Sequence, residues 1–373
     1  MSRFGLVTGD FVPTGGMDYA NHALADYLAR HGHAVELVAH RAALELTSRP
    51  NVTFRRVAKP LGSYLLGSWP LAWAGRRATG RVIVNGGNCH VPDVNWVHYV
   101  HAAYRPTHGT GLLRAAKASV EYRLNRRSER AAIRAARTVV CNSERTRRDV
   151  IERLGVEPAR AVTVYYGTDP DRFRPATDTQ RAALRDSLGL PQGRPVVLFI
   201  GGLGDRRKGF DTVFDAWCQL AGRPSWDALL VVIGRGAELP AWQQRANDMG
   251  LQNGIRFLGF RSDVPDLLRA ADALVAPTRY EAYGLGVHEA LCCGLPALVS
   301  ATAGVAERYP LDLCELLLPD PDDATALADR LAEWRSNLDG WRDRVAPVSA
   351  ELRRRTWDDM ARDFLTAIGE PNS

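Results

Sequence analysis

Two glutamates, Glu281 and Glu289, stand eight residues apart and flank a turn, 283–286, that contains two glycines. The short apolar run 273–277 before them ends in proline and predicts a buried strand, and the residues after the turn, 287–293, predict a helix. A turn between a strand and a helix start presents backbone N–H groups and the positive helix end, and therefore favours an anion. One carboxylate could then bind sugar hydroxyls and the other a ribose.

A second candidate is the loop 201–209, Gly-Gly-Leu-Gly-Asp-Arg-Arg-Lys-Gly, between a predicted strand and a predicted helix. Its glycines allow the backbone to approach a ligand closely. Its three cations, Arg206, Arg207 and Lys208, suit a diphosphate. Lys208 is one of only three lysines among 48 basic residues, which indicates that a compact point charge is required there.

The first half of the chain carries three further candidates. Gly15 and Gly16 open a loop before a helix, but they lack the G-x-G-x-x-G pattern of dinucleotide binding, which argues against an NAD enzyme. His98 and His101 are either metal ligands or packed histidines, and no third ligand is evident. Ser143 precedes a predicted helix and suits its N-cap.

Composition limits the class of protein. A chain of 373 residues is long enough for two domains, and 46% hydrophobic with 24% charged residues is typical of a globular protein. No run approaches the ~18 apolar residues of a membrane span. The N-terminus resembles a strand and not a signal peptide, so we expect a cytoplasmic protein. The six cysteines lack zinc spacing, and we expect all of them to be buried and reduced. No metal site is predicted.

The positive charge is concentrated in residues 112–153, which hold twelve Lys/Arg and five Asp/Glu, a net charge of +7 in a chain of +6. Such a stretch is either a solvated helix face or a contact for an anionic membrane or an anionic acceptor. Nucleic acid is the least favoured partner, because aromatic residues are not interleaved with the arginines.

Strand and helix alternate in both halves, which predicts an α/β fold with parallel sheets covered by helices. We place one domain at 1–168, an interdomain linker at 169–194, a second domain at 195–355 and a terminal helix at about 356–373. The expected strands are 4–8, 34–39, 81–85, 94–100, 138–141, 162–166, 195–200, 229–233, 255–258, 273–276 and 297–300, and the expected helices are 18–31, 112–136, 210–220, 264–270 and 356–364.

The E-x7-E pattern, followed by Ala-x-x-x-Gly-x-Pro over 290–296, resembles the retaining nucleotide-sugar glycosyltransferases of family 4, also called glycosyl transferases group 1. The resemblance implies a GT-B fold of two facing Rossmann-like domains with a nucleotide-sugar cleft between them. The N-terminal domain would bind the acceptor and the C-terminal domain the donor, and the terminal helix would pack back on the first domain.

Carried over residue by residue, the resemblance gives catalytic roles to Glu281, Lys208 and His101 and acceptor-side roles to His98 and Ser143. One departure matters: Gly202 stands where the family has an arginine, and Arg206 and Arg207 are the candidates to supply that charge. The donor-binding residues implied are Gly15, Gly16, Arg206, Arg207, Lys208, Gly234, Phe260, Glu281, Ala282, Tyr283, Gly284, Leu285 and Glu289.

We therefore expect a retaining, metal-independent bacterial hexosyltransferase without cofactors, of the kind used in polysaccharide biosynthesis. A UDP-sugar is the favoured donor and GDP-mannose the next, and the acceptor is a saccharide, a glycolipid or lipid-linked sugar, or a natural product. Peripheral contact with the inner face of an anionic membrane would use the basic stretch. The alternatives are an inactive donor-binding partner subunit and a GT-B sugar-nucleotide epimerase or phosphorylase.

Overall fold

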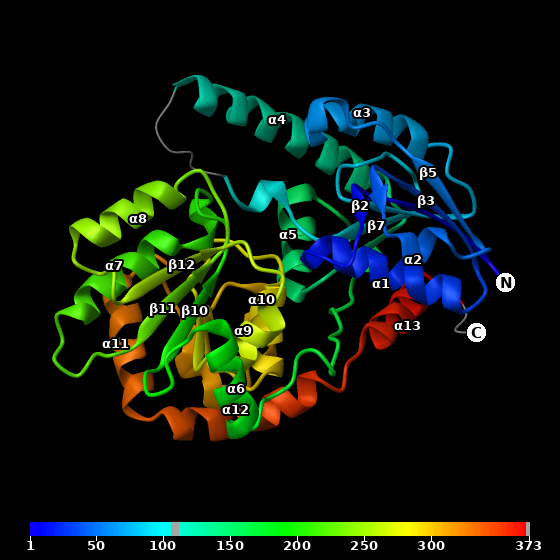
Figure 1. The fold of residues 1–373 in the computed structure, drawn as a ribbon. Coiled ribbons are helices and arrows are strands. Elements are labelled where there is room, and N and C mark those ends of the chain that lie inside the picture. The colour runs from blue at the N-terminus through cyan, green and yellow to red at the C-terminus, as the bar shows by residue number, and fades with distance from the viewer. Residues whose placement is uncertain (106–111, 371–373) are drawn as a thin grey trace. The chain divides into compact units, whose positions relative to one another are not determined.

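The computed structural model describes residues 1–105 and 112–370 of the chain and divides them into two compact units. The first unit holds residues 1–105, 112–167 and 355–370, and the second holds residues 168–354. Each unit is a parallel β-sheet covered by helices (Figure 1). The segment 169–194, expected to be a linker, lies in the second unit and contains a helix.

In the first unit the described residues form a seven-stranded parallel sheet with the strand order β5-β3-β1-β6-β7-β8-β9, and a small β2–β4 sheet beside it. Consecutive strands pair in parallel because helices and long loops return the chain to the same edge each time. The strands are β1 (Arg3–Val7), β2 (Asp10–Phe11), β3 (Ala34–Ala39), β4 (Arg41–Ala42), β5 (Val52–Arg56), β6 (Arg81–Asn85), β7 (Val94–Val97), β8 (Thr138–Cys141) and β9 (Ala161–Thr163).

Several helices of this unit bury apolar residues, among them the first and the last. The first and last of them pack together, with the rings of Tyr19 and Trp357 5.0 Å apart. The α-helices are α1 (Gly16–Arg30), α2 (Leu44–Thr47), α3 (Tyr64–Gly75), α4 (Leu112–Ala135), α5 (Glu144–Leu154) and α13 (Trp357–Ala367), and the 3-10 helices are η1 (Pro60–Gly62), η2 (His101–Ala103) and η3 (Pro158–Arg160).

In the second unit the sheet has six parallel strands within the described part, in the order β12-β11-β10-β13-β14-β15. The central strands are continuous apolar runs because helices cover both of their faces. The strands are β10 (Val196–Ile200), β11 (Leu229–Ile233), β12 (Ile255–Gly259), β13 (Ala273–Ala276), β14 (Ala297–Ser300) and β15 (Leu317–Leu318).

Helix α6, within the segment 169–194, is attached to this unit, because the buried Arg185 donates to the backbone oxygen of Ala270 at 2.9 Å. The α-helices are α6 (Asp178–Leu188), α7 (Phe210–Ala221), α8 (Leu239–Asp248), α9 (Val264–Ala270), α10 (Leu285–Cys292), α11 (Ala324–Ser336) and α12 (Leu338–Leu352), and the 3-10 helices are η4 (Arg206–Lys208), η5 (Gly304–Arg308) and η6 (Leu311–Leu316).

Both sheets reverse their strand order beside one strand, β1 in the first unit and β10 in the second. In open α/β sheets, ligands bind outside the carboxyl ends of the strands at this point. In the second unit β10 and β13 are neighbours there, and the loops that follow them are 201–209 and 277–284. The topology therefore brings the two glycine-containing motifs to one place.

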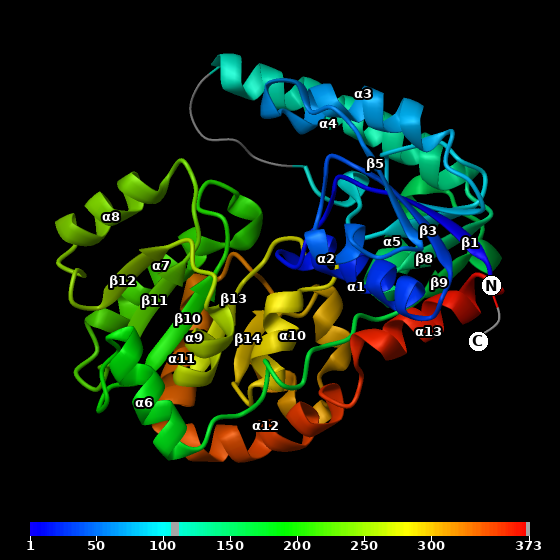
Figure 2. The ribbon, with the colours of Figure 1, turned by 45° about the vertical axis from the view of Figure 1, so that its right-hand side comes forward.

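The strand and helix pattern follows the expected one in most places, and the exceptions are local. Residues 45–90, for which the sequence predicts only the strand 81–85, also contain β5 and α3. Helices α3 and α4 run along the same edge of the first unit in both views (Figures 1 and 2). The expectation for the cysteines was wrong at two positions, because Cys314 is exposed and Cys218 is partly exposed. No helix in the described residues is both long and apolar enough to cross a membrane.

Candidate active site

The centre of the candidate site is an ion pair between the loops after β10 and β13. The Lys208 ammonium donates to Oε2 of Glu281 at 2.5 Å, although 73 positions separate the two residues. Burial alone would raise the pKa of the Glu281 carboxyl, but Lys208 and Arg207 lower it below its usual value. The site therefore holds an ionised carboxylate next to two cations. A ligand with hydroxyl groups could bind the carboxylate, and an anionic ligand could bind the cations.

The two arginines of η4 point to different partners. Arg207 Nη1 lies 3.6 Å from Glu281 Oε2 and donates to the backbone oxygen of Tyr280 at 3.2 Å, so it lies beside the ion pair. Arg206 instead donates to Asp211 at 2.7 Å and is half exposed. Of the two candidates for the missing family arginine, Arg207 is the one that lies beside Lys208 and Glu281.

Glycines hold these loops close together. Gly209 has a φ of +73°, and a Cβ atom there would lie 2.0 Å from the backbone oxygen of Pro277, at the end of β13. Gly234 has a φ of +151°, and its Cβ would lie 1.8 Å from the backbone oxygen of Gly201. Gly234, predicted to be donor-binding, thus positions the loop after β10 against the loop after β11.

Backbone hydrogen bonds from η5 fix the turn that follows Glu281. Gly304 donates its N–H to the backbone oxygen of Glu281 at 3.1 Å, and Val305 donates to that of Tyr283 at 2.7 Å. The side chains of Ala282 and Tyr283 are buried, so this turn offers a ligand its backbone. Helix α10 begins directly afterwards at Leu285, and its first N–H groups have no partner within the helix.

The end of α10 explains the Gly-x-Pro part of the motif. Leu295 donates to the backbone oxygen of Ala290 and Gly294, with a φ of +76°, donates to that of Leu291, which is a Schellman cap. These residues therefore terminate the helix and lead into β14. Glu289 is half-buried on this helix, and burial raises the pKa of its carboxyl to about 8 against the opposing charge of Arg172.

Phe260 lies directly after β12, at the same edge of the sheet. Its ring is 59% exposed, and the guanidinium of Arg235, which follows β11, lies 4.8 Å from the ring centroid. An exposed aromatic ring with a cation over it can stack on a planar ligand. Arg235 was not among the predicted site residues. It directly follows Gly234, the glycine after β11, and this position is the signal that could have identified it.

In the first unit, His101 is held by a buried carboxylate. Its Nδ1 lies 2.8 Å from Oε1 of Glu129, and its backbone N–H donates to the same oxygen at 3.0 Å. Glu129 comes from α4 and is only 1% exposed, while the His101 side chain is 36% exposed. The contact at Nδ1 fixes the ring and leaves Nε2 as the nitrogen available to a ligand.

His98 and Ser143 are interior residues. His98 is buried, its Nδ1 contacts the hydroxyl of Tyr166, and burial lowers the pKa of its ring to about 3. Of the two alternatives, a metal ligand and a packed histidine, this environment fits the packed, neutral histidine. Ser143 is the N-cap of α5 and accepts the N–H of Thr146 at 2.9 Å. Any acceptor-side role for these two residues stays a prediction.

Gly15 and Gly16 are exposed at the start of α1, and Gly15 has a φ of +79°. Two residues later stands Asp18, which the sequence did not single out. Burial, together with the nearby Asp10, raises the pKa of Asp18 to about 6. A carboxyl group with a raised pKa beside a glycine loop is a functional-site candidate. Within the described residues, no three His, Cys, Asp or Glu side chains gather as a metal site would require.

Comparisons with known proteins cover both units. Residues 14–172 match the model of Glycosyltransferase Family 4, and residues 194–337 match that of Glycosyl transferases group 1. The D-inositol 3-phosphate glycosyltransferase of Xylanimonas cellulosilytica is 31% identical over 252 residues, 65% of this chain and 59% of the relative. D-inositol 3-phosphate glycosyltransferase 2 of Catenulispora acidiphila is also 31% identical, over 61% of this chain and 58% of the relative. The matches thus span less than two thirds of these relatives.

Solved structures match the fold over almost the whole chain. WaaG, a glycosyltransferase involved in lipopolysaccharide biosynthesis, has a TM-score of 0.76 at 21% identity and covers 97% of this chain and 99% of its own. Anabaena Alr3699/HepE in complex with UDP and glucose has a TM-score of 0.72 at 17% identity, with 99% of both chains covered. Together with the two family matches, these similarities show that the chain belongs to glycosyltransferase family 4 and has the GT-B fold.

Proposed function

We propose that the protein is a retaining, metal-independent glycosyltransferase that moves a hexose from a nucleotide-sugar to a hydroxyl group of its acceptor. The observation that carries the proposal is the Lys208–Glu281 pair with Arg207 beside it, at the carboxyl ends of β10 and β13. A carboxylate that can bind sugar hydroxyls lies there next to cations that can bind a diphosphate.

The main physical task in this reaction is to stabilise the leaving diphosphate. When the bond between the sugar C1 and the phosphate oxygen breaks, its electron pair stays on the diphosphate. Lys208, Arg207 and the first N–H groups of α10 are the donors that would stabilise that charge. The acceptor oxygen forms its bond to C1 on the same face, and its proton passes to the departing diphosphate oxygen, so the anomeric configuration is retained.

Glu281 and His101 have positioning roles in this proposal. Glu281 accepts hydrogen bonds from the donor's sugar hydroxyls once Lys208 has turned to the diphosphate. His101, fixed by Glu129, presents Nε2 to the sugar's C6 hydroxyl. Glu289 binds the ribose hydroxyls, and the Phe260–Arg235 pair contacts the base.

For the donor we propose a UDP-hexose first and GDP-mannose second. The solved structures of Anabaena Alr3699/HepE with UDP and glucose and with UDP-glucose support uracil as the first base to test. The acceptor stays open between a saccharide, a glycolipid and a small natural product. Because several relatives carry the name D-inositol 3-phosphate glycosyltransferase, inositol 3-phosphate belongs in the acceptor panel.

The first experiment is a calorimetric titration of UDP, GDP, ADP and dTDP with EDTA present. We expect one nucleotide to bind clearly without a divalent metal, and Lys208→Ala to weaken that binding at least tenfold. Binding that appears only when a metal is added would overturn metal independence. The absence of binding by all four nucleotides would overturn the donor site itself.

Turnover is tested next with the donor that carries the preferred base. Lys208→Ala and Glu281→Ala should each lower kcat/KM for transfer by about 10²–10³, as the loss of one preorganised transition-state contact does. Product anomers read by NMR should keep the donor's configuration. A chain that binds the nucleotide yet neither transfers nor slowly hydrolyses any donor is the inactive partner subunit, and this result would exclude the enzyme.

We also propose that one edge of the first unit contacts an anionic membrane. Helix α3 exposes Leu66, Trp69 and Trp73 at helical spacing, with Trp69 78% exposed. Exposed tryptophans next to cations suit the interface of a bilayer. The cations come from α4, where Arg123, Arg126, Arg127 and Arg130 are exposed.

The structure separates the basic stretch 112–153 into two parts. In α5 Arg145 and Arg153 both pair with Asp149 at 2.9 Å, and the helix has four arginines against three acids, a net charge of +1, whereas α4 has seven Lys/Arg against two acids, a net charge of +5. The exposed arginines of α4 are therefore the part that we expect to bind lipid. Trp69→Ser combined with Trp73→Ser should abolish co-sedimentation with vesicles containing 30 mol%, or roughly one third, anionic lipid, while nucleotide binding stays unchanged. Equal co-sedimentation of wild type and variant would refute this contact.

A further inference from the structure

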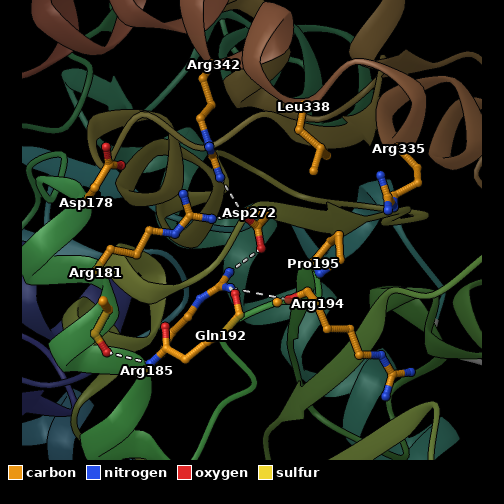
Figure 3. A pocket seen from close by; sticks show the side chains of 12 residues that line it. Asp178, Arg181, Arg185, Gln192, Arg194, Pro195, Asp272, Arg335, Leu338 and Arg342 are labelled. Atoms are coloured by element: carbon orange, nitrogen blue, oxygen red, sulfur yellow. Dashed lines mark hydrogen bonds and ion pairs between the residues drawn. The ribbon is translucent and has the colours of Figure 1, made fainter.

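A pocket of about 380 Å³ lies at the edge of the second sheet opposite to the candidate active site. Figure 3 shows the side chains that line it. Pro195 and Asp272 mark this edge, because each directly precedes a strand, β10 or β13. The same two strands therefore carry the Lys208–Glu281 pair at their carboxyl ends and this pocket at their amino ends. The lining residues are Asp178, Arg181, Ala182, Arg185, Gln192, Gly193, Arg194, Pro195, Asp272, Arg335, Leu338 and Arg342.

Three guanidinium groups share one carboxylate in this pocket. Arg181 and Arg185 from α6 and Arg342 from α12 all pair with Asp272, whose side chain is 3% exposed. Figure 3 shows the three side chains converging on Asp272 from different directions. The inner cluster thus carries three positive charges and one negative charge, an excess of two positive charges.

The carboxylate of Asp272 already accepts hydrogen bonds from most of the groups around it. Besides the three arginines, Asp272 accepts the backbone N–H of Val196 through Oδ2 at 2.6 Å. Arg185 turns its remaining donors to backbone oxygens, including those of Ala270 and Pro191. Arg181 and Arg342 are placed differently, because their side chains are 16% and 34% exposed and line the pocket. Of their N–H groups that do not face Asp272, Nη1 of Arg342 contacts the exposed Asp339, and the others are the ones that an anion could reach.

The other charges around the pocket do not reverse this excess, because five arginines and two aspartates, Asp178 and Asp272, line the pocket and give it a net charge of +3. Arg335 is paired with Asp227 through two contacts, and Asp339, which contacts Arg342 at 3.3 Å, is 94% exposed. Burial and the like charges of Arg342 and Arg185 lower the pKa of Arg181 to about 9, although Asp178 and Asp339 act in the opposite direction. The crowding of cations at this point is therefore costly unless an anion accompanies it.

We propose that this arginine-lined pocket is a binding site for a phosphate group, either as the free ion or as part of a small phosphorylated metabolite. A phosphate anion complements the net positive charge of the lining, and its oxygens can accept paired N–H donors from planar guanidinium groups. The volume is within the range of small-molecule sites and leaves room for more than the ion alone.

The position of the pocket gives such a ligand a structural consequence. It would connect α6, which follows the point where the chain enters the second unit, to α12, which precedes the point where it leaves. Binding there stabilises the attachment of both helices to the sheet. The inference does not depend on the proposed transfer activity, because no residue of the pocket belongs to the candidate active site.

The test is a titration of the full chain with inorganic phosphate and with glucose 6-phosphate, read by thermal shift and calorimetry against sodium chloride of equal ionic strength. Saturable stabilisation is expected for wild type. Arg181→Gln and Arg342→Gln should each raise the Kd for phosphate at least tenfold, because each removes one guanidinium group and leaves Asp272 with two arginine partners and the N–H of Val196. Arg223→Gln is the matched control, since it removes a surface arginine of the same unit that pairs with Asp329 alone.

Two arms separate this site from the donor site. The phosphate response should persist in Lys208→Ala and in the presence of saturating UDP, whereas an effect at the donor site would be lost in both. Tighter binding of glucose 6-phosphate than of phosphate identifies a metabolite as the ligand, and equal binding identifies the free ion. The proposal is overturned if wild type shows no saturable response, or if folded Arg181→Gln and Arg342→Gln proteins respond as wild type does.

Discussion

Lys208 and Glu281 are in contact at 2.5 Å because β10 and β13 are neighbours in the second sheet, although 73 positions separate the two residues in the chain. Both strands end where the strand order reverses, and the loops that carry the two residues begin there. The contact is therefore a product of topology, and it places the only lysine of this unit against the first glutamate of the E-x7-E motif. Three of the predictions below depend on this pair or on its immediate supports.

The first prediction separates the two arginines of η4. Arg207→Gln should lower kcat/KM for transfer by roughly 10–100-fold, because it removes a cation beside the Lys208–Glu281 pair. Arg206→Gln removes a contact to Asp211, which Arg279 also holds, and should cost less than about threefold. Steady-state kinetics of both variants provide the measurement, and a larger loss in Arg206→Gln would reverse the assignment.

The second prediction concerns the acid dependence of stability. The lowered pKa of Glu281 means that its ionised form stabilises the fold above the usual value of 4.5, and that this contribution is lost as the pH falls through the lowered pKa. Lys208→Met removes the main cation and leaves burial to raise the pKa of Glu281. The variant should therefore be less stable than wild type at pH 7, with a difference that narrows towards pH 4.

Thermal unfolding of both proteins between pH 4 and pH 8 measures that difference. Lys208→Met combined with Glu281→Gln is the control, because it removes both charges and should recover much of the stability at pH 7. If the difference between wild type and Lys208→Met is constant over this range, the ion pair does not set the ionisation of Glu281.

The sequence was sufficient to predict the central buried strands and the strand–turn–helix arrangement around the E-x7-E motif. Strands 273–276 and 297–300 were predicted to the residue, because strands buried on both faces are short continuous apolar runs. Helix α3 was missed because its exposed face is apolar, so residues 64–75 lack the alternation of polar and apolar faces that identifies a surface helix. The choice between Arg206 and Arg207 depends on Asp211 and Tyr280, and only the folded chain brings these partners into reach.

A third prediction comes from Glu289. Burial raises the pKa of its carboxyl to about 8, so the folded state holds a proton that the unfolded state releases near 4.5. Stability should therefore fall as the pH rises from about 4.5 to about 8, and Glu289→Gln should remove that part of the fall. The variant should exceed wild type by roughly 1 to 3 kcal/mol at pH 8.5 and match it near pH 4.5.

The same substitution should weaken nucleotide binding, because Glu289 is the residue proposed to bind the ribose. Calorimetry with the preferred nucleotide tests this at pH 7. A variant with unchanged affinity and raised stability would show that the carboxyl is buried for structural reasons alone. A variant with lower stability at pH 8.5 would contradict the raised pKa.

The last prediction compares two glycines with similar backbone conformation. Gly209 has a φ of +73° and Gly189 a φ of +63°, so alanine is disfavoured at both by about 1–2 kcal/mol. At Gly189 the added Cβ would meet nothing within 4 Å, but at Gly209 it would lie 2.0 Å from the backbone oxygen of Pro277. Gly209→Ala must therefore push the loop that carries Lys208 away from the end of β13.

We expect Gly209→Ala to lose both stability and nucleotide binding, while Gly189→Ala loses a little stability and binds the nucleotide as wild type does. Denaturant unfolding and calorimetry of the two variants measure both properties, and equal nucleotide affinity in the two would show that this close approach does not position Lys208.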